Sequence, residues 1–122
     1  MRVLFVDDEP EVLAGLENLL RKDRHRWEMV FAGDAQSALN AMAKDPVDVV
    51  VSDIRMPGTP GTSLLNEVRQ RYPAAARIVL SGHAEHESIV RSLPVAHQFL
   101  SKPCEATTLR FAIERTDRKS VV

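Results

Sequence analysis

The chain has 122 residues, which is enough for one domain with a hydrophobic core, and its 44% hydrophobic and 27% charged residues are ordinary for a globular protein. Sixteen basic and seventeen acidic residues give a net charge of -1, which excludes a global attraction to nucleic acid or to an anionic membrane. No apolar run is long enough to span a membrane or to act as a signal peptide, and the single cysteine, Cys104, cannot form an internal disulfide, so we expect a cytoplasmic protein.

Short apolar or alternating runs along the chain predict five β-strands. They lie at residues 3–6, 27–31, 47–52, 78–80 and 96–100. Each is followed by apolar residues at helical spacing, which predicts a helix after Pro10, after Gly33-Asp34, around Leu64–Tyr72, around Ile89–Leu93 and around Leu109–Thr116. We expect one domain over residues 1–122, with a polar tail that frays from about Asp117.

The regular alternation of strand and helix predicts an α/β fold, a (βα)5 parallel sheet covered by helices on both faces. The first, third and fourth strands are apolar throughout, as strands buried on both faces must be. The second and fifth carry Glu28, His97 and Gln98, so we expect them at the edges. The order 2-1-3-4-5, that of a flavodoxin-like doubly wound sheet, satisfies both conditions. Right-handed crossovers then place helices one and five on one face and helices two, three and four on the other.

Asp53 lies at the carboxyl end of the third strand. The residues Met56-Pro57-Gly58 beyond it can neither continue a strand nor begin a helix cleanly. In an open parallel sheet this edge is where ligands bind. The predicted order brings Asp7 and Asp8 from the first strand to the same edge.

Two further polar residues reach this edge in the predicted sheet, Ser81 from the fourth strand and Lys102 from the fifth. Each has an ordinary structural explanation, as a strand-end hydroxyl and a solvated charge. In the same way, Asp53 can be a turn acid, and Asp8 can cap the first helix, a role that contributes about 1 kcal/mol. The cluster as a whole is harder to explain in this way, because two charges about 4 Å apart repel by roughly 4 kcal/mol at an effective dielectric constant near 20.

A divalent cation would offset the repulsion among the three clustered carboxylates, which Lys102 can neutralise only in part. Oxygen ligands without histidine or cysteine favour Mg²⁺ or Mn²⁺ over zinc. A metal beside a lysine and a hydroxyl suits phosphoryl transfer, since Lys102 can offset charge on the phosphoryl oxygens and Ser81 can donate a hydrogen bond to one of them. An ionised Asp53 is a competent nucleophile and would give an acyl phosphate.

Four motifs in the same order resemble the response-regulator receiver domain of two-component signalling, over nearly the whole chain. They are Val6-Asp7-Asp8-Glu9, Asp53-Ile54-Arg55-Met56-Pro57-Gly58, Ser81-Gly82 and Lys102-Pro103. The resemblance implies that Asp53 accepts a phosphoryl group from a phosphohistidine on a sensor histidine kinase or phosphotransfer protein. It implies that Asp8, Asp53 and the backbone carbonyl of Arg55 bind Mg²⁺, that Asp7 acts through water, and that Ser81 and Lys102 contact the phosphoryl group.

The resemblance also implies a switch, in which Ser81 and Phe99 change the surface of helix four, strand five and helix five. That surface would control an output domain or a downstream protein, or form a homodimer. Phe99 has no hydroxyl, so a hydrogen bond that a tyrosine would make there is absent. Thr59-Pro60-Gly61 replaces the more usual Met-Asp-Gly, and Lys102-Pro103 resembles the family's cis peptide.

Two other functions are open to such a chain. A metal-dependent phosphatase or phosphotransferase with an aspartyl nucleophile typically has a second acid two residues later, where this chain has Arg55. A receiver-like interaction domain that no longer needs phosphate often lacks an acid or the lysine, whereas this chain keeps all of them. The motifs around Asp53 and Lys102 look similar to receivers joined to metal-dependent phosphohydrolase-like output domains. The kinase, the output and whether the chain is a stand-alone regulator or part of a longer protein stay open.

Overall fold

The computed structural model describes residues 1–53, 61–81, 98–101 and 105–121, some of them near the ends of these segments by their backbone alone. The strands are β1 (Arg2–Val6), β2 (Glu28–Ala32), β3 (Val49–Ser52), β4 (Ala76–Ser81) and β5 (Gln98–Ser101). The helices are α1 (Pro10–Leu19), the short 3-10 helix η1 (Arg21–Asp23), α2 (Ala35–Lys44), α3 (Gly61–Arg71) and α5 (Ala106–Val121). The predicted fourth helix, around Ile89–Leu93, lies outside the described residues.

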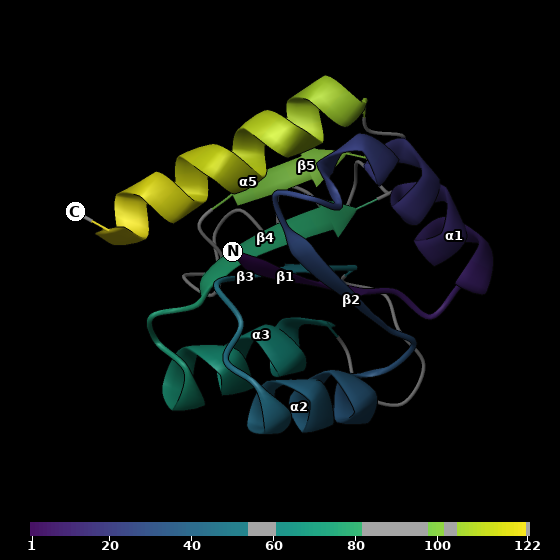
Figure 1. Cartoon of the computed structure of the whole chain (residues 1–122). Coiled ribbons are helices and arrows are strands. Elements are labelled where there is room, and N and C mark those ends of the chain that lie inside the picture. The colour runs from purple at the N-terminus through teal and green to yellow at the C-terminus, as the bar shows by residue number, and fades with distance from the viewer. Residues whose placement is uncertain (54–60, 82–97, 102–104, 122) are drawn as a thin grey trace.

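All neighbouring strands pair in parallel, in the order β2-β1-β3-β4-β5, which confirms the predicted fold class and strand order. Figure 1 shows α1 and α5 on one side of the sheet and α2 and α3 on the other, as right-handed crossovers require. The edge position of β2 is visible in its burial, since only its last residue, Ala32, is fully buried. By contrast, all four residues of β3 are buried.

Two hydrophobic cores lie on the two faces of the sheet. Under α2 and α3 the core contains Leu4, Val6, Ala38, Met42, Val50, Leu64, Leu65, Val68 and Val79. Under α1 and α5 it contains Val3, Phe5, Leu16, Leu20, Trp27, Val49, Val51, Ile78, Leu80, Leu109 and Ile113. Successive residues of a strand alternate between these two sets, so the central strands hold both helical layers.

Several element boundaries differ from the predicted ones. Strand β3 begins at Val49 rather than Val47, and Asp48 before it already bonds to β1, donating its N–H to the Arg2 carbonyl at 2.9 Å. Strand β4 begins two residues early, at Ala76, and includes the buried Arg77, a residue type that does not signal a strand. Helix α5 continues to Val121, beyond the apolar pattern that ends at Thr116, and the expected fraying from about Asp117 stays a prediction. No proline or glycine interrupts this segment, and basic residues suit a helix C-terminus.

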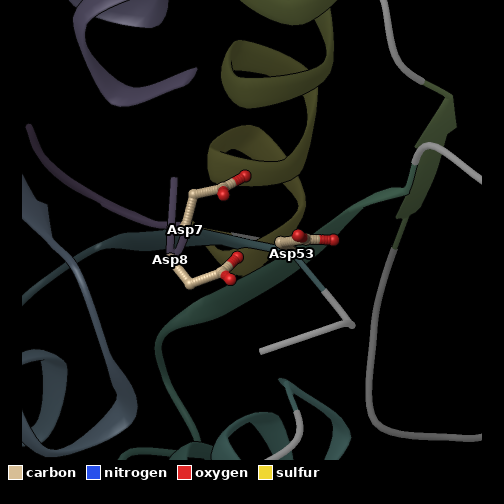
Figure 2. Close-up of side chains that lie close together, drawn as sticks. All are labelled: Asp7, Asp8 and Asp53. Atoms are coloured by element: carbon tan, nitrogen blue, oxygen red, sulfur yellow. The ribbon is translucent and has the colours of Figure 1, made fainter. Parts of the chain in front are cut away.

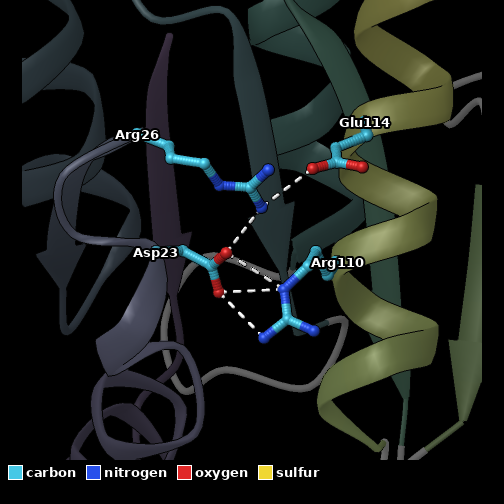
Figure 3. A network of polar contacts seen from close by, with 4 residues as sticks. All are labelled: Asp23, Arg26, Arg110 and Glu114. Atoms are coloured by element: carbon cyan, nitrogen blue, oxygen red, sulfur yellow. Dashed lines mark hydrogen bonds and ion pairs between the residues drawn. The ribbon is translucent and has the colours of Figure 1, made fainter.

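A network of charged side chains joins η1 to α5 (Figure 3). The carboxylate of Asp23 is 4% exposed and lies between two guanidinium groups. Arg110 donates from Nε to both carboxylate oxygens at 3.0 Å, and Arg26 donates from Nη2 to Oδ1 at 2.6 Å. Arg26 also pairs with Glu114 at 2.9 Å and lies over the ring of Trp27, 5.3 Å from its centre. Burial raises the pKa of Asp23, but the hydrogen bonds from Arg110 and Arg26 outweigh it, so this pKa lies below its ordinary value.

Among the residues that the structure describes, no helix is both long and apolar enough to cross a lipid bilayer.

Candidate functional site

Three carboxylates meet at the carboxyl edge of the sheet, those of Asp7, Asp8 and Asp53 (Figure 2). One oxygen from each lies within 4.8 Å of the other two. Asp7 and Asp53 are nearly buried, at 2% and 7% exposure, and Asp8 is half-buried. In Figure 2 the side chains of Asp7 and Asp8 extend from the end of β1 toward Asp53. The cluster that strand order predicts is therefore present in the structure.

The sheet itself places these residues together. Val6 of β1 is the register partner of Ser52 of β3, so Asp7 and Asp53 each follow directly at the same level. Asp53 donates its N–H to the Val6 carbonyl at 3.0 Å, and Asp7 donates its N–H to the Ala32 carbonyl at 3.2 Å. Backbone hydrogen bonds to neighbouring strands thus fix both residues.

Asp7, rather than Asp8, stabilises the turn into α1. Asp7 Oδ1 accepts a hydrogen bond from the N–H of Glu9 at 3.0 Å. The N-cap of α1 is Glu9, which makes no side-chain capping bond, and Pro10 begins the helix. The explanation of Asp8 as a helix cap is therefore wrong. The half-buried carboxylate of Asp8 is instead part of the acid cluster.

The donor set of the cluster consists of carboxylate oxygens alone, and it is the one group of this kind among the described residues. Two carboxylate charges 4.8 Å apart repel by about 3.5 kcal/mol at an effective dielectric constant near 20. Hard divalent cations such as Mg²⁺ prefer oxygen ligands, whereas zinc prefers nitrogen and sulfur. The residues present therefore fit a hard divalent cation.

The other predicted site residues are described only in part. The backbone of Ser81 ends β4 beside Ser101, the last residue of β5, which puts Ser81 at the same edge of the sheet. The backbone of Phe99 pairs with Val79, in the middle of β5. The side chains of Ser81 and Phe99 are not described, and Arg55, Lys102 and Pro103 lie outside the described residues.

The structure adds one residue that the sequence interpretation did not single out. Ser52 is fully buried, and its hydroxyl donates a hydrogen bond to the backbone carbonyl of Asp53 at 2.9 Å. A signal for it exists in the sequence, because Val49-Val50-Val51 predicts another apolar residue at the next position of a strand buried on both faces.

A doubly wound parallel sheet with a cluster of acids at its carboxyl edge defines an α/β protein whose ligand site lies at the strand ends. The chain matches the model of the response regulator receiver domain over residues 3–114, and it belongs to this family.

Named relatives and solved structures agree with this assignment. The chain is 35% identical over 103 residues to the hydrogenase transcriptional regulatory protein HoxA of Cupriavidus necator, covering 83% of the chain and 21% of HoxA. It is 32% identical over 115 residues to the C4-dicarboxylate transport transcriptional regulatory protein DctD of Pseudomonas aeruginosa, covering 93% of the chain and 24% of DctD. The structure of the signal receiver domain of an HD domain-containing protein from Pseudomonas fluorescens superposes with a TM-score of 0.89 and 30% identity, covering 98% of this chain and 96% of that one. The chain thus spans about a fifth to a quarter of the length of these two curated relatives.

Proposed function

We propose that Asp53 is the phospho-acceptor of this receiver domain and takes its phosphoryl group from a phosphohistidine on a sensor histidine kinase or phosphotransfer protein. The observation that carries the proposal is the cluster of Asp7, Asp8 and Asp53 within 4.8 Å at the carboxyl edge of the sheet. Asp53 extends this cluster from the end of the central strand β3, with its backbone held by β1. The membership of the receiver family supports the same assignment.

In the reaction, a carboxylate oxygen of Asp53 forms a bond to phosphorus while the bond from phosphorus to the histidine nitrogen breaks. The imidazole leaves with that electron pair, and Asp53 becomes an acyl phosphate. We propose that Ser81 and Lys102 contact the phosphoryl oxygens, Ser81 as a hydrogen-bond donor and Lys102 as a positive charge. The position of Ser81 at the end of β4 supports its part in this proposal.

We propose Mg²⁺, or Mn²⁺, as the cofactor. Asp8, Asp53 and the backbone carbonyl of Arg55 would hold the ion, and it would offset charge on the phosphoryl oxygens. Asp7 would act through water, which fits the engagement of its Oδ1 by the N–H of Glu9.

The output is proposed to be a change in the surface of the predicted fourth helix, around Ile89–Leu93, together with β5 and α5, set by Ser81 and Phe99. This surface would contact an output domain or a downstream protein, or a second copy of the chain. The length of the relatives supports an output domain in the same polypeptide, since HoxA and DctD are more than four times as long as the matched region. We propose that residues 1–122 form a single receiver domain that acts in the cytoplasm.

The acceptor assignment is tested by incubating the protein with acetyl phosphate and Mg²⁺ and measuring the intact mass. The wild type should gain one phosphoryl group and Asp53→Asn should gain none. Asp45→Asn is the matched control, because Asp45 is an exposed acid beyond the end of α2, and this variant should be labelled like the wild type. Equal labelling of wild type and Asp53→Asn would contradict the assignment.

A further inference from the structure

Ser52 is a polar residue at a strand position whose neighbours on both adjacent strands are apolar. It is fully buried at the end of β3, where its register partners are Val6 of β1 and Val79 of β4. Both partners and Val50, two residues earlier on the same strand, belong to the core under α2 and α3. Because side chains alternate along a strand, Ser52 faces this same apolar core. A hydroxyl there is unfavourable unless it is hydrogen-bonded.

The hydroxyl of Ser52 makes its hydrogen bond to the residue that carries the chemistry. It donates to the backbone carbonyl of Asp53 at 2.9 Å. On the other side of the same Cα atom, the N–H of Asp53 donates to the Val6 carbonyl at 3.0 Å. The two bonds together restrain both backbone dihedral angles of Asp53, and these angles direct its carboxylate toward Asp7 and Asp8.

We propose that Ser52 is a positioning residue for the phospho-acceptor: its hydroxyl holds the carbonyl of Asp53 and thereby fixes where the acceptor carboxylate lies relative to the other two acids. Ser52 touches neither the ion nor the phosphoryl group and acts only through Asp53. The expected effect on phosphorylation rests on the proposed function, whereas the expected effect on Mg²⁺ binding needs only the acid cluster.

The test compares four variants in the folded state. Ser52→Ala removes the hydroxyl, and Ser52→Cys keeps the approximate volume but has only a weak donor. Ser52→Thr keeps the hydroxyl. Val50→Ala is the control, because Val50 has the same strand, the same face and the same complete burial, but no bond to Asp53. Each protein is titrated with Mg²⁺ while the amide resonances of Asp7, Asp8 and Asp53 are followed by NMR, and its labelling rate with acetyl phosphate is measured at saturating Mg²⁺.

Ser52→Ala and Ser52→Cys should weaken Mg²⁺ binding and slow labelling by about five- to tenfold, the range expected for one lost hydrogen bond. Ser52→Thr should restore both to within about twofold, and Val50→Ala should lower thermal stability while leaving both unchanged. Wild-type values in Ser52→Ala and Ser52→Cys would overturn the proposal. Equal losses in Val50→Ala would overturn it as well, because the hydroxyl would then have only a structural role.

Failure of the proposed function gives a different pattern. If the wild type is not labelled at Asp53 at all, the acceptor assignment fails, and the Mg²⁺ titrations alone decide the role of Ser52. Should Ser52→Thr not fold, because its extra methyl group has no room between Val6 and Val79, the comparison of Ser52→Cys with Val50→Ala still separates the hydrogen bond from the packing.

Discussion

Replacing Asp23 by asparagine should destabilise the fold strongly, although the substitution preserves the shape of the side chain. Asparagine has no charge. Its amide NH2 group would also place a hydrogen-bond donor against the guanidinium groups of Arg26 and Arg110, which are themselves donors. Because this network joins η1 to α5, the substitution loosens a contact between segments 87 residues apart in the sequence.

The size of the effect follows from the geometry. A hydrogen bond to a charged group contributes about 1.5–3 kcal/mol, and removing one partner of a buried ion pair costs about 3–5 kcal/mol. Asp23 is buried, but Arg110 and Arg26 are 29% and 44% exposed, so water can hydrate them again after the substitution. We therefore expect Asp23→Asn to lower the free energy of unfolding by about 2–4 kcal/mol.

Urea denaturation at pH 7 measures this difference. Unfolding entropy is about 2.1 cal/mol/K per residue, so for 122 residues each kcal/mol corresponds to about 4 °C in melting temperature. Glu28→Gln is the matched control, because Glu28 is 69% exposed and pairs with Arg2 at 2.7 Å. An exposed ion pair contributes less than about 1 kcal/mol, so the control should change stability little. A loss in Asp23→Asn no larger than that in Glu28→Gln would refute the reasoning.

The pH dependence provides a second check with a definite sign. The pKa of Asp23 is lower in the folded state than in the unfolded chain, because the hydrogen bonds from Arg110 and Arg26 outweigh the effect of burial. Its contribution to stability is therefore present above the unfolded pKa of about 4, and it is lost as the pH falls through the lower, folded pKa. The stability difference between wild type and Asp23→Asn should be constant from pH 8 to pH 5 and should narrow below pH 4. A difference that grows on acidification would contradict the assigned direction.

Two further predictions concern the site and its output. Asp8→Ala should weaken Mg²⁺ binding yet stabilise the metal-free protein by about 1 kcal/mol or more, because it relieves repulsion among the carboxylates, and no capping bond by Asp8 is lost. Thermal melts with and without Mg²⁺ check this, and an unchanged Mg²⁺-dependent rise in melting temperature would show that Asp8 is not a ligand. Beryllofluoride with Mg²⁺, as a phosphoryl mimic, should shift the NMR signals of Phe99 and residues 82–97, whereas changes confined to the residues around Asp53 would exclude the switch.

The sheet order could be predicted from the sequence because a strand that is buried on both faces is apolar throughout, whereas an edge strand can carry charged residues. The Val49–Val51 run is apolar on both faces and lies in the centre, whereas Glu28 is tolerated in β2 because that strand is at the edge. Arg77 is an exception to this rule. Its long side chain is buried within β4, although its residue type predicts neither a strand nor burial.

The site could be predicted as far as it depends on strand ends. Asp7, Asp8 and Asp53 follow strands whose neighbours were predicted correctly, so their meeting required no side-chain detail. The role of Asp23 could not be predicted in this way, because its partner Arg110 is 87 residues away and the pair depends on where η1 and α5 lie in the folded chain. The hydrogen bond of Ser52 depends on the backbone path just beyond β3, which the strand pattern does not specify.

The two groups of acids in this chain have opposite energetic consequences. The charge of Asp23 is met by two arginines and contributes to the stability of the fold. At the carboxyl edge three carboxylates lie within 4.8 Å of one another, and each pair repels by about 3.5 kcal/mol at an effective dielectric constant near 20. The net stability of a domain of this size is only about 5–15 kcal/mol, so a repulsion of this order is large compared with that net stability. An ion that binds the folded cluster relieves the repulsion, and by linkage the same ion stabilises the fold by an amount that grows with the logarithm of its concentration above the dissociation constant. The repulsion within the acid cluster is therefore consistent with a cation-binding site, and the rest of the fold must be stable enough to tolerate this repulsion when no ion is bound.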